Sequence, residues 1–518
     1  MTNIQKQVND NKRIARNTLF LYVRMAISLI VSLYTSRVVL NTLGVVDYGI
    51  NNVVAGFVSM FAFLNSSLTA SIQRYYNYER GQNGIAGTQS VYKVAIISQL
   101  LLALLVFILV ESVGIWYLNN ELVLPPDRFA AAEFLFHLSL ASLLLLILQI
   151  PYSAAIVSYE KMDYYAFVGV LDTFLRLGVV IALPYVPFDK LIIYGFLGFF
   201  VSAFNYGMYY VYAKRHFIGL SFDRNINFNM LKEMISFSGW NAFGSFAVMM
   251  RSQGVNLILN VFFGPVVNAA RGVAYSIQSA MMGFIQNIST AARPQLTEAY
   301  ACKDYNRSTS LMFSVSKVCF IMLYMMVLPI GSEIHYVLHL WLGESVPMYT
   351  GVFTILIFSI SLVDVLNMPV SMIMLATGRV AKYNMVASIV GLFILPISYI
   401  VLRMGAVPLS VFIVSLFISI VVQVVCIYIM QSVTNIKASF YFFKVVLPLI
   451  CLVVMTFFIP SILHLVMDEG MGRMVCSLLI SILLVGYISY FVVLNKSEQV
   501  LVKNIVSKFV VKVKKISI

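Results

Sequence analysis

Long apolar stretches recur along nearly the whole chain, separated by short charged segments. Each holds about 20 residues or more, the length at which an α-helix crosses the hydrocarbon layer of a bilayer. They lie at 17–40, 49–72, 91–117, 129–156, 164–186, 190–213, 233–262, 266–290, 310–332, 350–375, 380–402, 407–431, 441–465 and 472–494. Since a backbone inside a membrane satisfies its hydrogen bonds only as helices or closed barrels, the sequence predicts an all-α polytopic membrane protein of about 14 transmembrane helices.

The composition supports this class and argues against two others. Hydrophobic residues make up 60% of the 518 residues and charged residues 11%, with a mean hydropathy of +0.89, whereas soluble domains carry about 25% charged residues. The net charge of +14 is spread between apolar stretches, so we expect no nucleic acid partner. The five cysteines show no CxxC or Cys/His spacing, which indicates neither a metal site nor a disulfide framework.

The positions of Lys and Arg predict the orientation of the chain. With the N-terminus inside, cytoplasmic segments hold 25 of the 35 Lys and Arg residues, and the outer loops hold Arg128, Lys190, Arg403 and Arg473. Positive residues in short loops resist translocation, so we expect an inner-membrane protein with both termini in the cytoplasm. Residues 495–518 place apolar side chains opposite lysines at helical spacing, which predicts an amphipathic tail on the cytoplasmic membrane surface.

A weak internal repeat has an offset of about 220 residues. Leu40, Asn41 and Gly44 recur as Leu259, Asn260 and Gly264. The repeat predicts a six-helix bundle over 1–216, a second over 217–435, two additional transmembrane helices over 436–494 and the tail 495–518. Both bundles begin on the same side, so we expect an axis along the membrane normal and a central cleft between the bundles.

Motifs of common enzymes are absent from the sequence: there is no Walker A, GxSxG or HExxH pattern. The longest outer loop, about 333–349, has fewer than 20 residues, which is short for the ordered outer region that a membrane polymerase or ligase would need. We therefore expect a transport protein that is not an enzyme, with no catalytic residue, no cofactor and no metal.

Arginines inside the apolar stretches are the main candidates for substrate binding. An ionisable side chain at mid-helix costs about 2.5–3.5 kcal/mol on insertion scales, so each needs a partner, a water-filled cavity or a use. A guanidinium suits phosphate oxygens, and several in one cavity predict an anionic substrate. The candidates are Arg24, Arg37, Arg251 and Arg271, with Gln253 and Asn256 near Arg251. Snorkelling to the interface is the alternative for Arg24, Arg37 and Arg271.

Acidic residues inside the stretches suggest two further features. Asp172 and Arg176 are four residues apart, so we expect them to neutralise one another on one helix. Asp364 is followed by Asn367 and Pro369, which predicts a kinked helix carrying a titratable carboxylate. Asp364 is therefore the candidate for coupling transport to H⁺ or Na⁺, and a structural polar contact is the alternative.

Several segments together resemble a known family. These are Arg16 to Thr18, Ser36 to Asn41, Leu43 to Ile50 and Gln73 to Tyr75, and in the second repeat Ala270 to Ala274 and Ala292 to Leu296. They resemble polysaccharide-biosynthesis flippases of the Wzx type, which belong to the MOP superfamily together with the MATE drug exporters and the lipid II flippases.

The resemblance implies a bacterial flippase for surface polysaccharide, either O-antigen or capsule. Its cargo would be an undecaprenyl-pyrophosphate-linked oligosaccharide, moved from the cytoplasmic to the periplasmic leaflet by alternating access. On the resemblance, Arg24, Arg37, Arg251 and Arg271 would attract pyrophosphate or acidic sugars in a cavity lined by the first, second, seventh and eighth helices. The implied partners are the bilayer, the lipid-linked oligosaccharide, H⁺ or Na⁺, and polysaccharide assembly proteins.

Two alternatives stay open. A MATE-like ion-coupled exporter of organic cations shares the architecture, but its cavity should be acidic rather than rich in arginine. A membrane glycan polymerase should carry an acidic pair in an outer loop, and the candidates for such a pair are Glu333, Glu344, Asp468 and Glu469.

Overall fold

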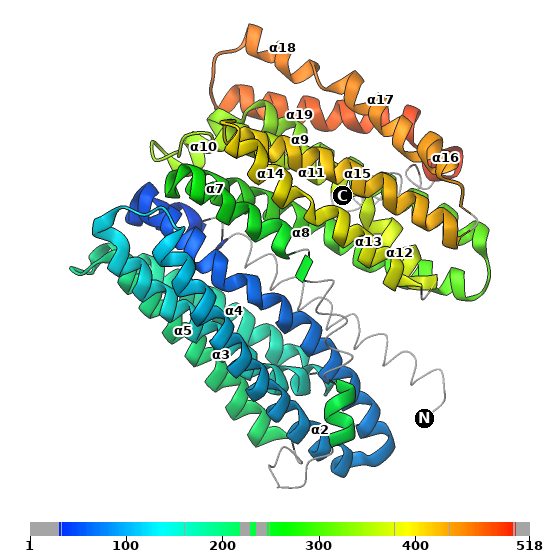
Figure 1. Ribbon diagram of the computed structural model, residues 1–518. Coiled ribbons are helices and arrows are strands. Elements are labelled where there is room, and N and C mark those ends of the chain that lie inside the picture. Colours follow the sequence, from blue (N-terminus) through cyan, green and yellow to red (C-terminus); the bar gives the residue numbers. More distant parts are fainter. Residues whose placement is uncertain are drawn as a thin grey trace, which may run out of the picture. The chain divides into compact units, whose positions relative to one another are not determined.

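The computed structural model describes residues 31, 32, 34–159, 161–217, 228–234, 246, 247, 249–377, 379–434, 436–500 and 503. These residues form helices joined by short loops, with no strand among them (Figure 1), which confirms the all-α prediction. Within this part of the chain, 11 helices are long and apolar enough to cross a membrane. Arg24, much of the predicted span 233–262 and nearly all of the tail after residue 500 lie outside the described residues.

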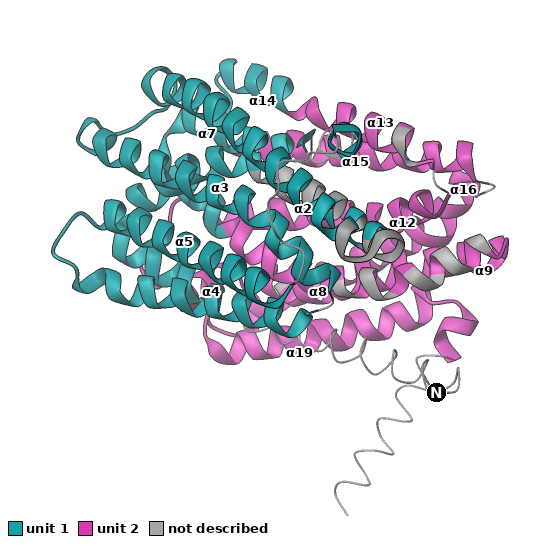
Figure 2. Cartoon of the chain, turned by 90° about the horizontal axis from the view of Figure 1, so that it is seen from below, with its two compact units in different colours: residues 1–273, 395–408 teal, residues 274–394, 409–518 magenta. Residues whose placement is uncertain are grey.

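The chain divides into two compact units (Figure 2). Unit 1 comprises Met1–Val273 with Leu395–Pro408, and unit 2 comprises Ala274–Ile394 with Leu409–Ile518. Unit 1 thus extends past residue 216 and includes the first part of the predicted second bundle. The arrangement as two six-helix bundles with two appended helices stays a prediction.

Unit 1 begins with the helical segment Tyr34–Ser59. Its further elements are the 3₁₀ turn η1 (Met60–Ala62), α2 (Phe63–Asn120), η2 (Pro126–Arg128), α3 (Phe129–Ser158), α4 (Met162–Ala182), η3 (Leu183–Tyr185), α5 (Lys190–His216), the π-helical turn η4 (Met250–Gly254) and α7 (Val255–Phe263). The helix α8 (Pro265–Ala301) starts in unit 1 and continues into unit 2, and most of α14 (Ile394–Arg403) belongs to unit 1.

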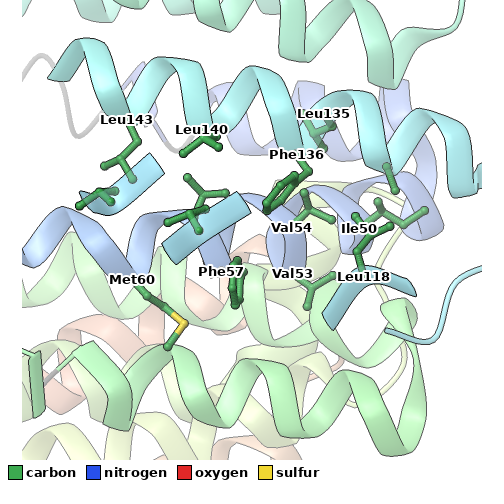
Figure 3. Close-up of a cluster of buried hydrophobic side chains, with 14 of the residues drawn as sticks. Ile50, Val53, Val54, Phe57, Met60, Leu118, Leu135, Phe136, Leu140 and Leu143 are labelled. Carbon is green, nitrogen blue, oxygen red and sulfur yellow. The ribbon is translucent and has the colours of Figure 1, made fainter. Parts of the chain in front are cut away.

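The long helix α2 folds back on the segment before it. Buried side chains at 50–58 pack in one core cluster with Leu118 (Figure 3). Val106 and Val110 belong to the same cluster. A second cluster joins Ile72 and Tyr76 to side chains at 91–95. The chain therefore reverses direction between residues 76 and 91, as the separate predicted spans 49–72 and 91–117 require.

Unit 2 is built from shorter helices. They are α9 (Tyr305–Ser332), α10 (Ile334–Leu342), α11 (Thr350–Asp364), α12 (Asn367–Thr377), α13 (Val380–Leu392), α15 (Leu409–Val433), α16 (Ala438–Tyr441), the π-helical turn η5 (Phe442–Val446), α17 (Leu447–Thr456), α18 (Ile459–Val466), α19 (Met471–Ile488) and the π-helical turn η6 (Ser489–Val493). The predicted kink near Asp364 is confirmed, because α11 ends there and α12 restarts at Asn367. Pro369 lies in the first turn of α12, where a missing N–H is tolerated.

The two glycines of the sequence repeat both have a positive φ. Gly44 has φ +78° and Gly264 has φ +73°, a left-handed region that glycine enters without steric cost. Gly264 separates α7 from α8, and Gly44 lies between the predicted spans 17–40 and 49–72. The shared positive φ supports a duplicated helix–glycine–helix element.

Candidate functional site

The predicted polar residues of the seventh span begin at an interruption in the helix. Residues Met250–Gly254 form a π-helical turn that contains Arg251 and Gln253, and α7 follows directly. A π-helical turn departs from the regular hydrogen-bonding pattern and often marks a functional position. Arg251 and Gln253 are partly exposed, so their side chains are not fully enclosed in the core of unit 1.

Arg271 on α8 is bound to this turn. It is 5% exposed, and its Nη2 donates a hydrogen bond to the Ser252 carbonyl at 2.7 Å. Ser252 is the direct neighbour of Arg251, so the structure brings two of the four predicted arginines to one turn of the protein. A buried guanidinium needs such contacts, because its desolvation is otherwise very costly.

Asparagines connect the same region to the segment Tyr34–Ser59. Asn256 Nδ2 donates to the Asn52 carbonyl at 3.0 Å, and Asn268 Nδ2 donates to Asn256 Oδ1 at 2.8 Å. Asn260 Nδ2 donates to Asn268 Oδ1 at 3.0 Å, and its Oδ1 accepts from the Val123 N–H at 3.0 Å. Asn256 is 2% exposed and already has partners on both ends of its amide, so it positions the site by holding α7, α8 and residue 52 together.

Glycines let these segments approach closely. A Cβ at residue 49 would lie 1.9 Å from the Pro265 carbonyl oxygen, and one at residue 272 would lie 2.6 Å from Asn52 Oδ1. A Cβ at residue 56 would lie 2.9 Å from Asn256 Nδ2. Gly49 and Gly272 belong to the segments on which the family resemblance rests, and the close backbone approach gives those positions a physical reason.

The remaining predicted site residues are less concentrated. Arg37 is partly exposed in the segment Tyr34–Ser59 of unit 1. Asp364 is the last residue of α11 in unit 2 and is also partly exposed. Arg24 lies outside the described residues. Substrate binding by the arginines, Gln253 and Asn256, and ion coupling by Asp364, therefore stay predictions.

The predicted pair of Asp172 and Arg176 is confirmed. Arg176 Nε lies 3.1 Å from Asp172 Oδ1. Asn205 on α5 joins them, because its Nδ2 donates to the same Asp172 oxygen at 2.6 Å. Asn205 was not predicted, because it lies 33 residues away from Asp172 on another helix.

Two ion clusters escaped the sequence analysis because their members are far apart in the chain. In unit 1, Arg128 contacts Asp47 and Asp189, with Nε 2.8 Å from Asp47 Oδ1 and Nη1 2.5 Å from Asp189 Oδ2. Asp189 also caps α5 by accepting from the N–H groups of Leu191 and Ile192 at 3.0 and 3.2 Å.

In unit 2, the fully buried Glu333 accepts from Arg473 Nη2 at 2.9 Å and lies 3.0 Å from His464 Nε2. A separate pair lies near the middle of α9, where Lys317 Nζ donates to Glu498 Oε2 at 3.0 Å. Glu333 and Arg473, which the sequence analysis placed in outer loops, thus contact one another.

The fold places the chain in one structural class. Family models and curated proteins give no match, whereas solved structures do: the chain has the fold of transporters of the MOP superfamily. It is similar to the lipid II flippase MurJ in an inward closed conformation, with a TM-score of 0.71 and 12% identity over 91% of this chain and 98% of that chain.

Two further solved structures share the fold. An inward-facing MATE multidrug resistance transporter has a TM-score of 0.67 and 14% identity over 79% of this chain and 97% of its own. The other is a MOP superfamily transporter from Pyrococcus furiosus, with a TM-score of 0.57 and 13% identity over 81% of this chain and 95% of its own. It is described as having a binding pocket of reverse polarity that suggests a different function. Identities this low show the fold alone.

Proposed function

We propose that this protein is a flippase that moves an undecaprenyl-pyrophosphate-linked oligosaccharide from the cytoplasmic to the periplasmic leaflet of a bacterial inner membrane. The product would serve surface polysaccharide biosynthesis, as O-antigen or capsule. Alternating access would hide the polar cargo from the hydrocarbon, whose crossing is otherwise prohibitive. No covalent chemistry is required. We also propose that both termini lie in the cytoplasm.

One observation indicates that the cargo is negatively charged. Arg271 is held at the backbone of Ser252, beside Arg251, and a charge inside a membrane is costly unless it has a partner, water or a use. Two guanidinium groups near one turn favour a ligand with phosphate oxygens, because the planar fork can donate two parallel hydrogen bonds to them. A lipid-linked pyrophosphate meets this requirement, and the similarity to a lipid II flippase supports a lipid-linked cargo.

A MATE-like exporter is the second candidate, because a MATE transporter shares the fold. Organic cations would be repelled by Arg251 and Arg271, so the exporter hypothesis needs a different site. Coupling to H⁺ or Na⁺ through Asp364 fits both candidates.

Deletion of the gene separates the two candidates. On the flippase proposal, the deletion strain loses surface glycan and accumulates lipid-linked repeat units on the cytoplasmic side. Expression of Arg251→Ala restores surface glycan poorly and Arg251→Lys partly, because lysine keeps the charge but lacks the planar fork. Unchanged glycan with altered drug resistance would favour the exporter. A reporter fused after Asn495 should be active only in the cytoplasm.

A further inference from the structure

Unit 1 contains a cavity of its own, apart from the turn that carries Arg251. It has a volume of about 640 Å³ and is lined by the segment Tyr34–Ser59 and by α2, α3, α4 and α5. On α3 the lining extends from Leu135 to Val157, about 33 Å along a helix that rises about 1.5 Å per residue. Ligand pockets in proteins typically measure about 300–1,000 Å³, so this cavity can hold a ligand of several rings.

The lining is polar but nearly without net charge. Among the described residues that line the cavity, the charged ones are Asp172 and Arg176, which neutralise one another. The other polar groups are neutral amides, hydroxyls and phenols, including Gln73, Gln149 and Tyr209. A cavity of this kind gives neither a phosphate nor an organic cation a strong electrostatic partner.

Three serine hydroxyls of the lining have acceptor capacity left. Ser142, Ser153 and Ser202 each donate to a carbonyl of their own helix, at 2.9, 3.1 and 3.1 Å. A serine hydroxyl has one donor and two acceptor lone pairs, so these three side chains have acceptor capacity left and no donor. The cavity therefore suits a ligand that brings many hydrogen-bond donors.

Asn205 adds an unsatisfied acceptor. Its Nδ2 donates to Asp172, whereas its Oδ1 is buried without a hydrogen-bond partner. The acidic partner fixes the amide in this orientation, because the opposite orientation would place two oxygens against each other. A buried acceptor without a partner costs about 1–3 kcal/mol, and a donor from a ligand would remove that cost once a small shift of the side chain brings the oxygen to the cavity. Gln149 makes no hydrogen bond with the described part of the chain.

We propose that this cavity binds an uncharged, hydroxyl-rich part of a glycan. Sugar hydroxyls supply the donors that Asn205 and the serines lack, and the apolar faces of sugar rings match the aliphatic and tyrosine side chains of the lining. This inference rests on the proposed function and refines it. The sugar part of the cargo is recognised in unit 1 by neutral groups, and the pyrophosphate is recognised by Arg251 and Arg271.

Binding to the full-length protein in nanodiscs tests this division. The probes are lipid-linked oligosaccharides extracted from the membranes of the deletion strain, undecaprenyl phosphate, and the free neutral sugar maltotriose. The variants are Asn205→Leu and Gln149→Leu; the second keeps the test valid if the first fails to fold. Asn119→Leu is the matched control, because Asn119 is an exposed amide that donates to Ile115 of its own helix at 2.8 Å and does not line the cavity.

The expected result is that Asn205→Leu and Gln149→Leu weaken binding of the lipid-linked oligosaccharide about tenfold, while undecaprenyl phosphate binds as to the wild type and Asn119→Leu changes nothing. Equal binding of the oligosaccharide by both cavity variants and the wild type, or equal weakening for both lipids, would overturn the inference. If the wild type binds neither lipid, the flippase proposal fails, and the binding of maltotriose then tests the sugar cavity by itself. Maltotriose binding that is lost in Asn205→Leu and kept in Asn119→Leu supports a sugar cavity. If the wild type does not bind maltotriose either, the sugar cavity is refuted.

Discussion

The guanidinium of Arg271 and the carbonyl of Ser252 are joined by a 2.7 Å hydrogen bond that connects α8 to the π-helical turn before α7. Arg271 thereby holds in place the backbone next to Arg251. The two arginines differ in exposure, since Arg271 is 5% exposed and Arg251 is only partly buried. We expect loss of Arg271 to reduce both stability and transport, and loss of Arg251 to reduce chiefly transport.

Substitution of Arg271 tests this difference. Arg271→Met removes the donor to Ser252 and should destabilise the protein by about 1–3 kcal/mol, seen as a lower midpoint of thermal unfolding in detergent. Arg251→Met is the matched control and should reduce transport with a smaller change in the midpoint. Equal unfolding midpoints for Arg271→Met and the wild type would contradict the structural role of Arg271.

Gly49→Ala tests the close packing of the segment Tyr34–Ser59 on the start of α8. The added Cβ would overlap the Pro265 carbonyl, 1.9 Å away, so the two segments must separate and the unfolding midpoint should fall. Gly178→Ala is the control, because a Cβ there meets nothing within 4 Å and alanine favours a helix by about 1 kcal/mol over glycine. A midpoint for Gly49→Ala that equals or exceeds that of the control would show that this contact is not tight.

The buried ion pair of unit 2 predicts strong coupling between two substitutions. Glu333→Ala leaves the largely buried Arg473 without its carboxylate and should cost about 3–5 kcal/mol. The double substitution Glu333→Met with Arg473→Met removes both charges and should be milder than Glu333→Ala. Unfolding in detergent of Glu333→Met, Arg473→Met and the double variant measures the coupling, and purely additive effects would argue against a direct pair.

Asp189 predicts a dependence of stability on acidic pH. Burial raises the pKa of this carboxyl, but the hydrogen bond from Arg128, the backbone N–H groups of Ile192 and Leu191 and the charge of Arg128 together bring the pKa below its usual 3.8. The stabilisation is therefore complete above about pH 4 and is lost as the pH falls through the lowered pKa.

Asp189→Asn is the matched variant for this test, because its side-chain oxygen can still cap α5 while the charge is removed. At pH 6 the wild type should be more stable than Asp189→Asn. The difference in their free energies of unfolding should become smaller as the pH is lowered below about 4. A difference that grows toward low pH would mean that the pKa of Asp189 is raised.

Local patterns predicted much of the fold and little of the site. The all-α class, the break at Asp364 and the pair of Asp172 with Arg176 follow from local patterns along the chain, and the structure confirms them. The contacts of Arg128 with Asp47 and Asp189 join residues 81 and 61 positions apart, and Arg473 reaches Glu333 over 140 positions. Such pairs depend on how helices pack, and helical periodicity carries no information about that packing.

The most direct measurement of the central claim is leaflet exchange in proteoliposomes that contain the purified full-length protein and lipid-linked oligosaccharides from the deletion strain. An enzyme added outside that modifies only the outer leaflet reports the exposed fraction over time. The flippase proposal predicts that wild-type protein makes nearly all of the lipid-linked oligosaccharide accessible, that Arg251→Ala slows this exchange strongly, and that Gly178→Ala does not. Accessibility that stays at about the outer-leaflet half with wild-type protein would contradict the proposal.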